Sequence, residues 1–169
     1  MTYVFYIAGG IALISAALVV IQRNAMHAVL YLTLSLLAIA LVFYSLGAHF
    51  VAALQVIIYA GAIMVLFLFV IMMLNPERPQ RVPPFWRQPR RWLPPLALSA
   101  AMVIALLYLT LSGRTVAAPG GAAVTPRAVS YALFGPYLVA VELASVLLIA
   151  ALVGALHLAA AWGRGLRER

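Results

Sequence analysis

The feature that most constrains this chain is an apolar run of 24 residues, Val51–Leu74, which contains no charged residue and no proline. As a helix rising about 1.5 Å per residue, the run would be ~36 Å long, whereas the hydrocarbon core of a bilayer is ~30 Å thick. A membrane helix with excess length tilts, or it holds an extra residue in a local bulge. Near the middle of the run, Tyr59 is followed by the small residues Ala60, Gly61 and Ala62. The run therefore predicts a membrane-spanning helix whose centre serves either in helix packing or in the function of the protein.

The composition extends this prediction to the whole chain. Of its 169 residues, 67% are hydrophobic and 8% are charged, whereas soluble domains are roughly half apolar and about a quarter charged. The absence of cysteine excludes disulfides and thiolate ligation of iron–sulfur clusters by this chain. We therefore expect one polytopic, all-α integral membrane domain over residues 1–169.

Four other apolar runs predict four more membrane helices. The five expected helices cover about residues 3–21, 26–46, 51–74, 96–111 and 134–162. Between the third and the fourth lies a loop, residues 75–92, that is rich in proline and arginine. Because proline lacks a backbone N–H and fixes φ, this loop cannot be helical throughout, and we expect it to extend along the membrane surface.

The arginines predict the orientation. Nine of the eleven lie on one side of the predicted membrane, in the link after the first helix, in the loop 75–92 and in the C-terminal tail. The positive-inside rule then places the N-terminus outside, in the periplasm, and the C-terminus and the loop 75–92 in the cytoplasm. In such positions arginine sets topology and contacts anionic membrane lipid, so the net charge of +8 does not indicate nucleic-acid binding.

Three polar residues inside the predicted spans are candidates for chemistry. Gln55 and Tyr59 are four residues apart, which puts them on one face of an α-helix, where they would line a water path or bond to another helix. Glu142 is the one acid inside a span, and an intramembrane acid is a functional candidate by default. Glu142 would be neutral and bonded to Ser145, would face a water cavity, or would pair with another subunit.

Two other classes of function are open at this point. His27 and His157 lie near the cytoplasmic ends of their predicted helices, so a haem held by two histidines, as in a membrane anchor subunit, is conceivable. A small channel or transporter component would need a polar lining, for which the chain offers only Gln55, Tyr59 and Glu142. Five spans give no inverted-repeat symmetry of the kind found in transporters.

Three segments carry a resemblance to a known family. QVIIYAGAIMVLFLFVIMMLN (Gln55–Asn75) resembles the third helix of the J-subunit family of the bacterial proton-pumping NADH:quinone oxidoreductase, respiratory complex I. Asn24–Phe50 and Leu133–His157 are similar to the same family. The resemblance implies a five-helix, multi-pass subunit of the bacterial inner membrane that has no redox centre of its own. FMN, the iron–sulfur clusters and quinone would be held by other subunits, and its neighbours would be membrane subunits like A and K and an antiporter-like subunit.

The resemblance also implies a mechanism. In this family the third helix holds a π-bulge around its tyrosine–glycine segment, and conversion to a regular α-helix gates a water path used in proton translocation. Carried over, the gating residues are Tyr59, Ala60, Gly61, Ala62, Ile63, Met64 and Val65, and Gln55 and Glu142 are proton- or water-path candidates. Many relatives carry glutamate where this chain has Gln55, whose amide orders water but does not titrate.

Overall fold

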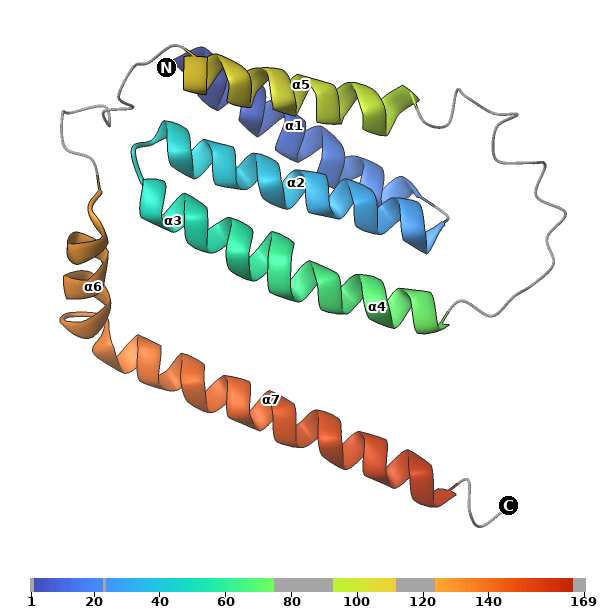
Figure 1. The fold of residues 1–169 in the computed structure, drawn as a ribbon. Coiled ribbons are helices and arrows are strands. Elements are labelled where there is room, and N and C mark those ends of the chain that lie inside the picture. Colours follow the sequence, from blue (N-terminus) through green and yellow to red (C-terminus); the bar gives the residue numbers. More distant parts are fainter. Residues whose placement is uncertain (1, 23, 75–92, 112–123, 166–169) are drawn as a thin grey trace, which may run out of the picture. The chain divides into compact units, whose positions relative to one another are not determined.

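The computed structural model describes residues 2–22, 24–74, 93–111 and 124–165, and every regular element in these ranges is helical (Figure 1). The elements are α1 (Thr2–Ile21), α2 (Ala25–Ser45), α3 (His49–Leu54), the π-helix η1 (Gln55–Ile63), α4 (Met64–Leu74), α5 (Leu93–Leu111), α6 (Pro126–Phe134) and α7 (Leu138–Gly165). The predicted cytoplasmic loop 75–92 lies outside the described residues. The chain divides into two compact units, Met1–Thr125 and Pro126–Arg169.

The helices confirm the all-helical membrane class. Four described segments are long and apolar enough to cross a membrane: Tyr3–Ile21, Ala25–Ser45, His49–Leu74 and Leu138–Ala160. A fifth apolar segment, Leu93–Tyr108 in α5, is shorter. α5 begins three residues earlier than predicted, with two prolines in its first turn, where their missing N–H groups cost no helical hydrogen bond.

The core of the first unit lies among α1, α2 and α5. Its buried members come from all three helices: Val4, Ala8, Ile11, Ala12, Leu34, Ala38, Leu41, Met102 and Ala105. A hydrogen bond also joins α1 to α2, because the Ser35 hydroxyl donates to the Ala12 carbonyl at 3.0 Å. The α2 helix starts with a side-chain cap, in which Asn24 accepts from the Met26 N–H at 2.9 Å. Alanines at this seam let the two backbones approach closely.

The segment His49–Leu74 forms one continuous composite helix, α3–η1–α4, which we call helix 3. In Figure 1, α2 lies between α1 and helix 3, and successive helices of this unit run in opposite directions. A tight turn joins α2 to helix 3, and Gly47 has a positive φ of 79° there, a conformation that favours glycine. Helix 3 begins at His49, two residues earlier than predicted.

The second unit departs most from the sequence prediction. The last membrane helix, expected over 134–162, is preceded by the separate helix α6, and α7 begins only at Leu138. Pro136 interrupts the helix, and the turn around it is closed by hydrogen bonds from the Tyr137 N–H to the Ala132 carbonyl and from the Leu138 N–H to the Gly135 carbonyl, both 3.2 Å. Within this unit the chain bends sharply between α6 and α7 (Figure 1).

Candidate functional site

The candidate site is the π-helical centre of helix 3. The N–H of Gln55, where the segment begins, donates to the carbonyls of Ala52 and Val51, three and four residues back. At the far end the Met64 N–H donates to the carbonyl of Tyr59, five residues back, and to that of Gly61. Bonds between residues five apart are the mark of a π-helix, which is rare and is often found at functional sites.

Small residues make this geometry possible. Gly61 lies inside the π segment, and a Cβ added there would be 3.3 Å from the carbonyl oxygen of Val56, five residues back. That distance is tighter than an ordinary van der Waals contact. Its neighbours Ala60 and Ala62 are also small, so the wider π turn forms without large side chains crowding the carbonyls.

The packing of helix 3 gives the π segment a structural purpose. All 26 residues of helix 3 are described, and only Ala52 and Met64 are fully buried, at 6% and 3% exposure. Both belong to segments that pack against α2. They are twelve positions apart, and at about 100° per residue an α-helix would put them roughly 120° apart around its axis.

The π segment removes this mismatch. A π-bulge accommodates about one extra residue in a helix, which reduces the angle between Ala52 and Met64 to roughly 20°. Both side chains can then pack against the same neighbour, α2. No residue of the π segment itself is fully buried. Helix 3 packs against α2 through all three of its segments, and its two fully buried side chains lie just before and just after the π segment.

The other predicted residues of this site are less buried than Met64. Tyr59, Ala62, Ile63 and Val65 are exposed in this unit, and Tyr59 retains 48% of its accessible surface. Gln55, Ala60 and Gly61 are half-buried. The shared face expected for Gln55 and Tyr59 assumed α-helical spacing, whereas π bonding brings residues five apart into line. A polar strip formed by these two side chains stays a prediction.

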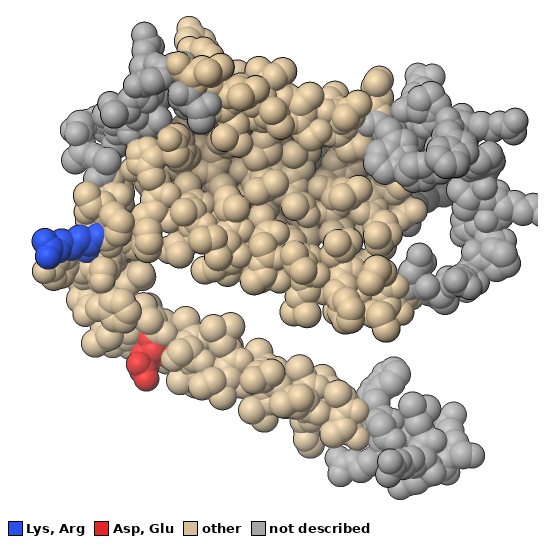
Figure 2. Space-filling model, viewed as in Figure 1, with Lys and Arg blue, Asp and Glu red and all other residues tan. Residues whose placement is uncertain are grey.

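Glu142 lies in the second unit, on α7. It is exposed there, on a described surface that carries few charged side chains (Figure 2). The Ser145 hydroxyl donates to the backbone carbonyl of Glu142 at 2.7 Å. The bond that the structure shows between these two residues thus runs from Ser145 to the backbone of its own helix, as serine in membrane helices commonly bonds, and the role of the Glu142 carboxyl stays a prediction.

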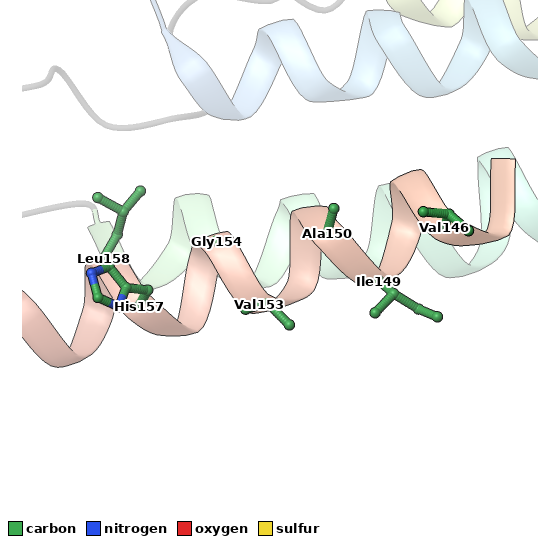
Figure 3. Close-up of a pocket in the computed structure, with 7 residues that line it drawn as sticks. All are labelled: Val146, Ile149, Ala150, Val153, Gly154, His157 and Leu158. Atoms are coloured by element: carbon green, nitrogen blue, oxygen red, sulfur yellow. The ribbon is translucent and has the colours of Figure 1, made fainter. Parts of the chain in front are cut away.

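The two histidines considered for a haem belong to different units. His27 lies in the first turn of α2. His157 lies near the end of an open groove of about 700 Å³ that follows one face of α7 from Val146 to Leu158 (Figure 3). The small residues Ala150 and Gly154 form its middle. Among the described residues, no group of three or more histidines and acids is placed to hold a metal ion.

Sequence reasoning missed Ala52, which with Met64 is one of the two fully buried residues of helix 3. The sequence did carry a signal, because the separation of Ala52 from Met64 along the chain is not a whole number of α-helical turns. That signal could be used only once the two residues were known to be buried against the same helix.

Comparisons with known proteins define the class of this membrane protein. Residues 15–158 match the family described as NADH-ubiquinone/plastoquinone oxidoreductase chain 6. The chain belongs to this family.

Its relatives carry a more specific name. The chain is 49% identical over 160 residues to NADH-quinone oxidoreductase subunit J of Escherichia coli (strain K12), covering 93% of this chain and 85% of that protein. It is 46% identical over 163 residues to the protein of the same name from Pseudomonas aeruginosa, covering 94% and 96%. A relative in Buchnera aphidicola, also named subunit J, is 43% identical over 159 residues.

Proposed function

We propose that this chain is subunit J of a respiratory NADH:quinone oxidoreductase, and that helix 3 couples quinone reduction in other subunits to proton translocation. The family match favours this function over the haem-anchor and channel alternatives. The observation that supports the coupling role is the π segment between Ala52 and Met64, the two fully buried residues of helix 3. The role of this chain is conformational, and FMN, iron–sulfur clusters and quinone belong to other subunits.

The conversion that we propose is a change of register. If the π segment became α-helical while His49–Leu54 stayed in place, Met64–Leu74 would rotate by about 100°. Met64 would leave α2, and Ile63, eleven positions after Ala52, would take its place. The side chains around them, from Tyr59 to Val65, would then enter or leave a water path shared with neighbouring membrane subunits like K. Gln55 and Glu142 would order water or carry protons on that path.

The membrane arrangement follows from the same proposal. Five helices would cross the bacterial inner membrane, with α5 as the shortest, the N-terminus in the periplasm and the C-terminus in the cytoplasm. The arginine distribution supports this orientation. The partners are other membrane subunits, among them those like A and K and an antiporter-like subunit. The exposed faces of helix 3 and α7 leave surface for contacts outside their own units.

Gly61→Val tests the coupling role. Valine adds a branched Cβ where a single carbon already lies 3.3 Å from the Val56 carbonyl oxygen, so it changes the balance between π and α states. An overpacking cost of about 1–3 kcal/mol shifts such a balance about 5- to 150-fold. We expect quinone reductase activity or proton pumping to fall in the assembled complex, while NADH oxidation with a soluble artificial acceptor is unchanged.

Gly10→Val is the matched control. Gly10 lies in α1, and a Cβ added there meets nothing within 4 Å. We expect this variant to keep both activities. Wild-type quinone reduction and pumping in Gly61→Val would refute the gating role, and an equal loss in both variants would show that the effect is not specific to helix 3.

A further inference from the structure

A recess on the second unit has no part in the proposed coupling. Its lining consists of Arg127, Ser130, Tyr131, Phe134 and Gly135, and its volume is about 410 Å³. Four of these residues belong to α6 and share one face of that helix, because they are three, one and three positions apart: Arg127, Ser130, Tyr131 and Phe134. All five are exposed in this unit.

The glycine at the end of the recess is required by the local backbone. A Cβ added at Gly135 would lie 2.6 Å from the carbonyl oxygen of Tyr131, closer than real Cβ atoms approach an oxygen. The turn after α6 therefore keeps the space beside Tyr131 free of a side chain. This turn also fixes the direction in which α6 leaves α7.

The position of α6 determines the level in the membrane at which the recess lies. The segment Leu138–Ala160 of α7 is long and apolar enough to span a membrane. The nine residues of α6 make a helix of only ~14 Å, too short to span, and α6 bends away from the α7 axis (Figure 1). A short helix at the end of a span, with a charged face that also carries aromatic rings, lies at the level of the lipid headgroups.

We propose that this recess binds the phosphate group of an anionic phospholipid. The Arg127 guanidinium supplies positive charge and a donor pair that matches two phosphate oxygens. The hydroxyls of Ser130 and Tyr131 can donate to the same group. The ring of Phe134 supplies apolar surface for the glycerol and upper acyl carbons. These aromatic and apolar contributions fit a lipid and give no advantage to a free phosphate ion.

Site-resolved photolabelling tests the proposal. The assembled complex is reconstituted in phosphatidylcholine vesicles that contain a phosphatidylglycerol probe with a photoreactive group close to its headgroup. We expect label on the peptide Ser130–Phe134. Arg127→Gln lowers this labelling about fivefold, as expected for about 1 kcal/mol per arginine near an anionic lipid surface. Arg127→Lys restores part of it, because lysine keeps the charge but not the planar donor pair.

Control variants distinguish a lipid site on α6 from a general effect of arginine charge. Arg114→Gln makes the same charge change at another position of the chain and is expected to leave the labelling unchanged. Equal labelling of Arg127→Gln and wild type, equal losses at both arginines, or displacement of the probe by inorganic phosphate would each overturn the proposal. If Arg127→Gln does not assemble, Tyr131→Phe tests the same recess and should lower the labelling less. Because the recess lies outside helix 3, labelling and coupling are independent readouts.

Discussion

α2 packs against two neighbours in different ways. Against α1 it forms a continuous seam of buried alanine, leucine and isoleucine side chains with one buried hydrogen bond between the helices. Against helix 3 it covers only two residues fully, Ala52 and Met64. Eight residues of α2 are buried, compared with five of the described residues of α1 and two of helix 3. All three are apolar enough to span, so hydropathy alone does not distinguish the fixed helix from the loosely held one.

This difference bears directly on the coupling role. Rotating part of α1 would break a broad packed surface and the Ser35–Ala12 bond. Rotating α4 would exchange one buried side chain, Met64, for another of similar volume, Ile63. Swaps that conserve volume in a packed site usually cost less than about 1.5 kcal/mol. Helix 3 is therefore suited to two registers, and the α1–α2 pair to one.

Met64→Ala should have the largest effect on stability. The buried side chain leaves a cavity against α2, and a change from methionine to alanine in a packed site costs about 2–5 kcal/mol. Thermal unfolding of the purified full-length chain in detergent measures the loss. Met73→Ala is the matched control, since Met73 lies on the same helix and is exposed, so its substitution should cost little. Equal losses in the two variants would contradict the assignment of Met64 as the residue that holds α4.

Asn24→Ala should have a smaller effect. Asn24 caps the start of α2, whereas Ala48 at the start of helix 3 provides no side-chain cap. Losing an asparagine cap costs about 1 kcal/mol. Asn24→Asp keeps an acceptor and should retain most of the stability in the same unfolding measurement. A cost as large as that of Met64→Ala would mean that α2 depends on its cap more than on packing.

Ser35→Ala should have the smallest effect. It removes the 3.0 Å bond to the Ala12 carbonyl, and hydrogen bonds between membrane helices are worth about 0.6 kcal/mol on average. Thr33→Val removes a hydroxyl that bonds within α2, to the Val29 carbonyl, and serves as the control for an intrahelical bond. A double variant with Met64→Ala should show additive losses, because the two residues lie at different seams. Strong coupling would show that the α1 and helix 3 interfaces are not independent.

The sequence predicted where the long helices lie better than it predicted the structure within and between them. Apolar runs gave the spans of the first unit to within about three residues, because membrane length and hydrophobicity determine them. The helix α6 was missed, since nine amphipathic residues between a glycine-rich stretch and Gly135–Pro136 carry no spanning signal. No periodicity marks the π segment either, because helix 3 is apolar on all sides. Its geometry depends on where α2 covers Ala52 and Met64, which is a tertiary property.

Deleting Ala60 tests the central claim most directly. The deletion puts Ala52 and Met64 eleven positions apart, so an unbroken α-helix presents both to α2 without a π segment. We predict that the complex still assembles and oxidises NADH with a soluble acceptor, whereas quinone-driven proton pumping in proteoliposomes is lost; Ala60→Gly, which keeps the chain length, still pumps. Proton pumping by the deletion variant at the wild-type rate would contradict the coupling role of the π segment.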